Sequence, residues 1–135
     1  FLKKNSMNYH YTKKINNITF EKAIERVTEE LQKEGFGILT EIDIKSTLKK
    51  KLDVDFYNYK ILGACNPSFA HQALRKEDKI GTLLPCNVIV QEKVSGTIEV
   101  STVDPVTSMS AIENESLAPI AIEVRDNLKK VIDNL

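Results

Sequence analysis

The chain has 135 residues and a mass of 15.3 kDa, and 41% of its residues are hydrophobic, which suits one domain that can bury a core unaided. Its 19 basic and 19 acidic side chains give a formal net charge of zero, so the whole chain creates no field that attracts nucleic acid or an anionic membrane. Residues 1–76 hold 14 basic and 9 acidic side chains, and residues 77–135 hold 5 and 10. These complementary halves could attract each other within a monomer or across a dimer.

Two features of the composition bear on where the protein works. No apolar run approaches the roughly 20 residues of a membrane-spanning helix, and two cysteines are too few for a disulfide scaffold. We therefore expect a soluble cytoplasmic protein without a membrane partner, although an exported mature form would look the same. Residues 1–7 lack the apolar stretch of a signal peptide and are interpreted as a disordered leader or an expression remnant, so that residues 8–135 form a single domain.

The first predicted elements are a strand and a helix. Residues 8–15, "NYHYTKKI", alternate well enough for a strand, and Thr19 then stands as the N-cap of a helix that ends at Gly35. The helix presents one apolar face, formed at helical spacing by Phe20, Ala23, Ile24, Val27 and Leu31.

A second strand and a shorter helix come next. Residues 35–42 predict the strand, and Asp43 caps a helix over residues 44–52 whose outer face carries lysines. Such lysines could hold an anion, but they more often form a solvated face. The largely apolar end of residues 57–64 then predicts a third strand in a buried position of the sheet.

The stretch "ACNPSFAHQAL", residues 64–74, carries a strong helix-start signal. Asn66 can accept hydrogen bonds from the free amides of the first turn, and Pro67 has no amide and a preset φ. At about 100° per residue, His71 lies off the core face and is expected to be partly exposed. The core face is expected to hold Phe69, Ala70, Ala73 and Leu74.

The rest of the chain predicts a loop, a hairpin and two helices. Residues 76–85 read as the loop, and residues 86–93 and 96–103 as two strands joined by a tight turn. Asp104 caps a short helix, and Ser116 opens the last one. The last helix has an apolar stripe made of Leu117, Ile120, Ala121, Val124, Leu128, Val131 and Leu135.

This order of elements predicts a two-layer α+β domain, in which helices cover a mainly antiparallel or mixed sheet. A doubly wound, flavodoxin-like sheet is the second choice, because the late hairpin interrupts strict alternation of strands and helices. The sequence contains neither G-x-G-x-x-G nor G-x-x-x-x-G-K-[ST], so the two commonest phosphate-binding fingerprints are missing.

Cys65 is the first candidate for chemistry. It is expected where a strand meets a helix N-terminus, and the positive end of the helix dipole there can favour a reactive thiolate. The alternative is a small buried apolar residue, which is how most free cysteines behave. His71 could act as a base for Cys65 or contact a ligand, but an ordinary surface histidine fits the same spacing.

Cys86 and Asn87 repeat the Cys-Asn pair at Cys65 and Asn66. Whether the two cysteines can form a disulfide or redox pair depends on topology. Parallel strands joined by the helix would place them at opposite edges of the sheet, whereas antiparallel neighbours would bring them close. The sequence has no C-x₂₋₄-C or H-x₃₋₅-H pair, so no metal site is predicted.

Four segments, "GFGILTEIDIKSTLKKKL", "YKILGACNPSFAHQAL", "IGTLLPCNVIV" and "VDPV", together resemble the family known as domain of unknown function 302. The resemblance covers nearly the whole chain from about Asn8. It implies a TATA-binding-protein-like α+β topology in a single copy and a homodimer, and it supplies no reaction and no catalytic residue. The matched motif positions are Asp43, Leu48, Lys50, Leu52, Cys65, Asn66, Pro67, Ala70, His71, Pro85, Cys86, Asn87, Asp104 and Pro105.

From these observations we expect a small uncharacterised domain that forms a homodimer and serves as a small-molecule-binding or accessory protein. The candidate site consists of Cys65, Asn66, His71, Cys86 and Asn87. The alternative is a thiol-dependent enzyme or redox protein that uses Cys65 with His71 or Cys86, so the question of catalysis stays open. The neutral charge argues against a nucleic-acid partner, and the residues leave any cofactor unknown.

Overall fold

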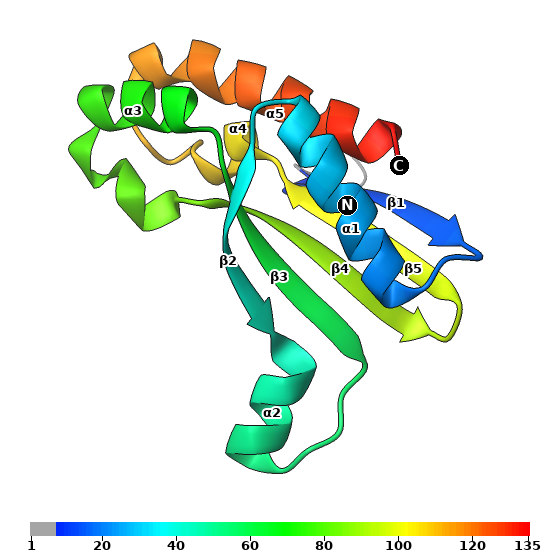
Figure 1. The fold of residues 1–135 in the computed structure, drawn as a ribbon. Helices are drawn as coiled ribbons and strands as arrows, with labels where there is room; N and C mark the ends of the chain where they lie inside the picture. The colour runs from blue at the N-terminus through cyan, green and yellow to red at the C-terminus, as the bar shows by residue number, and fades with distance from the viewer. Residues whose placement is uncertain (1–7) are drawn as a thin grey trace, which may run out of the picture.

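In the computed structural model, which describes residues 8–135, a five-stranded sheet runs in the order β1-β5-β4-β3-β2 (Figure 1). Every neighbouring pair of strands is antiparallel. The predicted two-layer α+β fold is confirmed, and the doubly wound alternative is wrong because it requires parallel strands. The interpretation of residues 1–7 lies outside the described part of the chain. The strands are β1 His10–Asn16, β2 Gly37–Asp43, β3 Asn58–Cys65, β4 Cys86–Val94 and β5 Thr97–Val103.

The three longest helices are α1 Phe20–Lys33, α3 Pro67–Lys76 and α5 Ala118–Asp133. Helices α1 and α5 pack on one face of this sheet, and α3 lies beside α5 near the end of β3 (Figure 1). The short helix α4 Pro105–Ser108 follows β5, and α2 Ile44–Leu52 projects beyond the end of β2 and β3 as a separate arm (Figure 1). Within residues 8–135, no helix is both long enough and apolar enough to cross a membrane.

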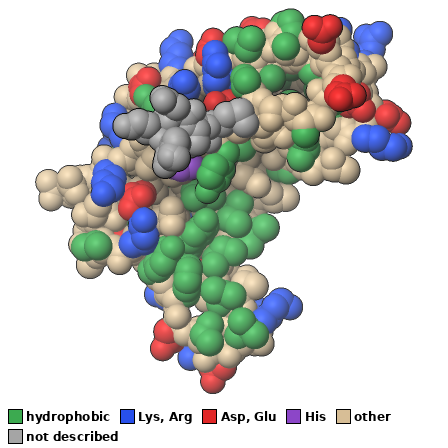
Figure 2. Space-filling model, turned by 180° about the vertical axis from the view of Figure 1, so that it is seen from behind, with side chains coloured by type: hydrophobic (Ala, Val, Ile, Leu, Met, Phe, Trp, Pro, Cys, Tyr) green, Lys and Arg blue, Asp and Glu red, His purple; other side chains and the backbone are tan. Residues whose placement is uncertain are grey.

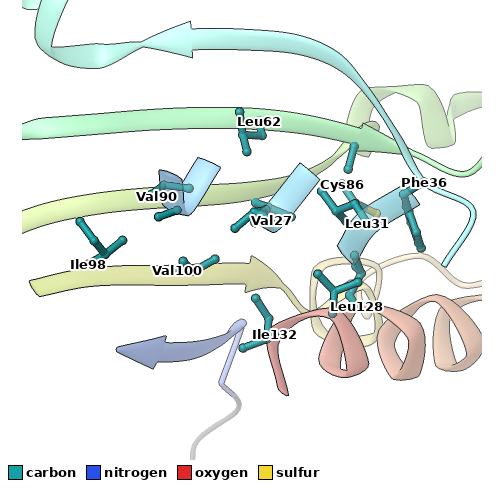
Figure 3. Packing of buried hydrophobic residues seen from close by; sticks show 14 of the residues in the cluster. Val27, Leu31, Phe36, Leu62, Cys86, Val90, Ile98, Val100, Leu128 and Ile132 are labelled. Atoms are coloured by element: carbon teal, nitrogen blue, oxygen red, sulfur yellow. The ribbon is translucent and has the colours of Figure 1, made fainter. Parts of the chain in front are cut away.

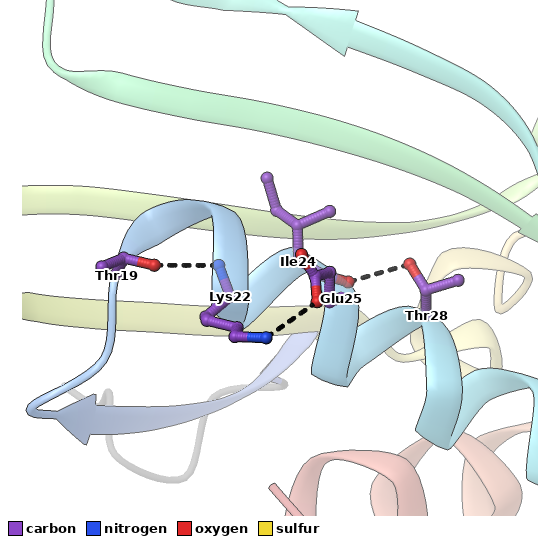
Figure 4. A network of polar contacts seen from close by, with 5 residues as sticks. All are labelled: Thr19, Lys22, Ile24, Glu25 and Thr28. Atoms are coloured by element: carbon purple, nitrogen blue, oxygen red, sulfur yellow. Dashed lines mark hydrogen bonds and ion pairs between the residues drawn. The ribbon is translucent and has the colours of Figure 1, made fainter.

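Helix α1 shows how local side-chain contacts fix an element. The Thr19 hydroxyl accepts a hydrogen bond from the Lys22 backbone amide at 3.1 Å, which confirms Thr19 as the N-cap. One turn along, the Lys22 ammonium lies 3.3 Å from a Glu25 carboxylate oxygen, and the Thr28 hydroxyl donates to the Ile24 carbonyl at 2.8 Å (Figure 4). The Lys22–Glu25 pair lies on the solvent side of the helix, opposite the apolar face that packs on the sheet.

The main core lies between the sheet and helices α1 and α5 (Figure 3). Because strand side chains alternate between faces, every second residue of β4 and β5 points toward these helices. Fully burying one such aliphatic side chain stabilises the fold by about 1.5–3 kcal/mol. The side chains labelled in Figure 3 are Val27, Leu31, Phe36, Leu62, Cys86, Val90, Ile98, Val100, Leu128 and Ile132.

Three sequence predictions need local correction. The loop over residues 76–85 contains a 3₁₀ helix, Asp78–Leu83. Ser116 does not cap the last helix; its amide donates to the Asn114 side chain at 3.1 Å, because a short 3₁₀ turn precedes α5. Leu74 was expected in the core but is 42% exposed, since α3 packs through Ala73 and Leu74 lies about 100° further round the helix.

Strand β2 forms one edge of the sheet and is irregular. Ile38 pairs with Ala64 and Thr40 pairs with Gly63, so one extra residue, Leu39, is inserted between them. The Leu39 side chain is 66% exposed. Such a bulge bends the strand and increases its twist.

Candidate ligand cavity

A small cavity lies where the ends of β3 and β4 meet α3, α4 and α5. Its volume is about 40 Å³, and it is lined almost entirely by apolar side chains. The larger wall residues are Phe36, Phe69, Leu84, Pro85, Pro105, Met109, Leu117, Ile120 and Val124, and the smaller ones are Ala64, Ala70, Ala73 and Ala121. The polar groups that reach this lining come from Cys65, Asn66 and Cys86.

Asn66 joins the end of β3 to the start of α3. Its side-chain oxygen accepts hydrogen bonds from the amides of Ser68 at 3.1 Å and Phe69 at 3.4 Å, so the predicted N-cap is confirmed. Its side-chain nitrogen donates to the Glu34 carbonyl at 3.4 Å. Gly35, at a φ of 83°, makes room for this group, since a Cβ there would lie 2.9 Å from the Asn66 nitrogen. Backbone contacts therefore hold the Asn66 amide in place.

The two cysteines lie at the neighbouring ends of β3 and β4. Of the two topologies considered, the antiparallel one is found, with Cys86 paired to Ala64 rather than directly to Cys65. Both cysteines are free; Cys65 is half-buried, and Cys86 is buried in the core cluster with Leu31 and Phe36 (Figure 3). The fold thus brings both thiols to one cavity without joining them.

Burial disfavours the charged form of both thiols. It raises the pKa of Cys65, and burial together with the neighbouring Cys65 raises the pKa of Cys86 to about 11. Stabilisation of a Cys65 thiolate by the α3 dipole, one of the two alternatives that the sequence left open, therefore does not dominate. A physical reason is that the Asn66 side chain already accepts the first-turn amides of Ser68 and Phe69. At neutral pH both cysteines are thiols, which act as weak hydrogen-bond donors.

The other two candidate residues lie elsewhere. His71 is exposed on α3, as its helical angle predicted, and it is not part of the cavity lining. Asn87 is exposed between two buried residues of β4, so its side chain points to the face of the sheet opposite the helices. The structure therefore brings together Cys65, Asn66 and Cys86, and separates His71 and Asn87 from them.

The far wall of the cavity was not assigned to a site from the sequence. It comes from α4, α5 and the segment between them, where Leu117, Ala121 and Val124 recur at helical spacing. The sequence shows this apolar spacing, but the same spacing is expected for a helix face that packs into a core without a cavity. Across this wall lies a wider surface hollow of about 440 Å³, which shares Met109, Leu117 and Ala121 with the cavity. Within residues 8–135, no group of three metal-ligating side chains comes together.

Comparisons with known proteins place the chain in a family. The search of curated proteins found no match. A crystal structure of an uncharacterized conserved protein DUF302 from Bacillus stearothermophilus is similar, with a TM-score of 0.84 and 29% sequence identity over 93% of this chain and 96% of that one. The model of the family described as domain of unknown function DUF302 matches residues 11–135. Because that match spans almost the whole chain, the protein belongs to the DUF302 family.

Proposed function

We propose that this protein is a homodimeric binding domain that takes a small apolar molecule into the cavity between α3, α4 and α5. The observation that carries the proposal is the cavity itself, which combines apolar walls with two thiols and a fixed amide. Binding sites for small molecules are typically concave and mostly apolar, with a few placed polar groups. An apolar cavity also holds water poorly, so an apolar guest meets little competition there.

The size of the cavity restricts the ligand. About 40 Å³ is far below the roughly 300–1,000 Å³ of a site for a drug-sized molecule. The resting cavity suits a guest of a few heavy atoms. A larger guest would need to displace part of the wall shared with the neighbouring hollow, and Met109 is the most adaptable side chain there because it is long and unbranched.

Thiol-dependent catalysis or redox chemistry is the other function that the sequence allowed. The raised pKa of Cys65 and of Cys86 weighs against it, because the thiolate is the nucleophile in such reactions. The rate of Cys65 alkylation as a function of pH distinguishes the two functions. An apparent pKa below that of a free cysteine, with faster alkylation at pH 7, would favour thiol chemistry over simple binding.

The binding proposal is tested by adding benzene or xenon to the isotopically labelled protein and following amide and methyl NMR signals. We expect shifts that saturate with concentration at cavity residues such as Ala73 and Val124. Ala70→Leu adds bulk at the cavity wall and should abolish these shifts. Gln72→Leu places the same side chain on the exposed side of α3 and should leave them unchanged. Unchanged cavity signals in the folded wild-type protein, even near ligand saturation of the buffer, would refute the proposal.

A further inference from the structure

The face of the sheet opposite the helices carries an apolar patch that the described residues leave open (Figure 2). Strand register places Ile42 of β2, Ile61 of β3 and Ile89 of β4 side by side in one row across this face. The same row continues into Ser101 of β5 and Thr12 of β1. Along this row the face is therefore apolar on β2, β3 and β4 and polar on β5 and β1.

An aromatic cluster extends the apolar patch toward the arm. The rings of Phe56 and Tyr57 are stacked with centroids 4.2 Å apart, and the ring of Tyr59 lies 5.9 Å from that of Tyr57. The Gln91 side chain of β4 donates a hydrogen bond to the Tyr57 hydroxyl at 3.1 Å, which ties the cluster to the sheet. The patch is thus continuous from the sheet to the segment that follows α2.

The arm gives a second, independent sign of a missing neighbour. Helix α2 has nine residues, none of which is buried, although Ile44, Leu48 and Leu52 recur on one side of it. Leu52 is 66% exposed, and Val54 beyond it is 43% exposed. An isolated helix this short is only marginally stable in water, so tertiary contacts normally hold such a helix. In the described chain, α2 packs mainly against β2 and β3.

We infer that this open face and the arm form the interface with a second copy of the chain, which gives the homodimer of the proposed function a specific surface. A two-fold axis close to Ile61 would lay apolar strands on apolar strands and leave the polar strands β1 and β5 at the rim. On that polar side, Glu99 pairs in register with Lys14 and lies 3.1 Å from the Lys93 ammonium. Balanced charge does not repel a second copy, whereas a nucleic acid or an anionic membrane would require an excess of positive charge.

The available area fits such a dimer. Five strands spaced ~4.8 Å apart and ~7 residues long give a face of roughly 550 Å², and the arm adds roughly 140 Å². The sum approaches the ~800 Å² that each partner contributes to a stable protein interface. Two sheets packed face to face in this way resemble the two layers of a β-sandwich.

The interface is tested by measuring mass in solution with sedimentation equilibrium at micromolar concentrations. We expect the wild-type protein to have twice the 15.3 kDa of one chain. Ile42→Glu should weaken dimerisation at least tenfold, as should Leu52→Glu in the arm. Ile42 is 45% exposed in a single chain, so its replacement leaves the monomer fold intact. Ile122→Glu is the matched control, because Ile122 is 43% exposed on α5 and lies away from the open face.

A wild-type mass of one chain would overturn both the interface and the dimeric part of the proposed function. Dimers that persist in Ile42→Glu and Leu52→Glu, or that weaken equally in Ile122→Glu, would overturn the interface alone. Benzene or xenon binding is measured separately, so failure of the cavity proposal leaves the mass measurement unaffected. Circular dichroism of each variant shows whether its chains remain folded. The inference requires that a lower mass comes from dissociation of folded chains; a lower mass that comes from unfolding would overturn it.

Discussion

Gly63 of β3 lies in a place where the chain has no room for a side chain. A Cβ at this position would overlap the Thr40 hydroxyl oxygen and lie 2.8 Å from the Pro85 ring. Gly63→Ala therefore forces Thr40 and Pro85 to move, and overpacking of this kind costs about 2 kcal/mol. Unfolding entropy of ~2.1 cal/mol/K per residue gives roughly 280 cal/mol/K for this chain, so the melting temperature should fall by about 7 °C.

Differential scanning calorimetry measures this effect, and the chain supplies its own control. A Cβ added at Gly37 meets no atom within 4 Å, so Gly37→Ala should melt within about 2 °C of the wild type. Adding Thr40→Ala to Gly63→Ala removes the overlapping oxygen but leaves Pro85 in place, and we expect it to restore about half of the lost stability. A Gly63→Ala protein that melts like Gly37→Ala would show that this part of the sheet relaxes freely and would refute the reasoning.

Two further predictions concern single polar side chains. Asn66→Ala removes the cap of α3 and should lower the free energy of unfolding by about 1–2 kcal/mol in urea titrations, whereas exposed Asn87→Ala should change it little. Glu92 accepts hydrogen bonds from the Gly96 amide and the Asn58 side chain, which lower its pKa. The contribution of Glu92 to the free energy of unfolding is therefore fully present above pH ~4.3, the pKa of an unfolded glutamate. It is lost as the pH falls through the lower pKa that Glu92 has in the folded protein. Glu92→Gln should cost roughly 0.5 kcal/mol at pH 7, and the difference should vanish in acid; a constant difference between pH 7 and pH ~2 would contradict this assignment.

Local features were the ones that the sequence predicted best. Thr19, Asp43, Asn66 and Asp104 were each expected to cap a helix, and in each case the side chain accepts a hydrogen bond from a backbone amide two or three residues ahead. Caps depend on a few neighbouring residues, so a short window of sequence contains the information. The hairpin of β4 and β5 was predicted for the same reason, and the α+β fold followed from the order of the elements.

Features that depend on distant contacts were not predicted. An apolar stripe such as that of Leu117, Ala121 and Val124 predicts a helix face that packs against other side chains. Whether those side chains fill the space or leave a cavity depends on the position of α3, which the stripe does not specify. The two readings of Cys65, a reactive thiolate or a small buried apolar residue, could not be separated from the sequence alone for a similar reason. Its position before a helix was read correctly, yet its pKa is set chiefly by burial among side chains from other elements. His71 illustrates the opposite case, since its exposure followed from its helical angle alone.

The bulge at Leu39 has a consequence for the behaviour of the protein in concentrated solution. An edge strand exposes unpaired backbone amides and carbonyls, which can recruit a strand from another molecule and begin aggregation. At one edge of this sheet, the extra residue Leu39 interrupts the regular ladder of β2. At the other edge, β1 carries the adjacent lysines Lys13 and Lys14, whose charges oppose stacking of identical strands. Both edges of the sheet are therefore poor templates for the addition of a strand from another molecule. Edge-to-edge polymerisation is thus disfavoured relative to the face-to-face contact inferred above.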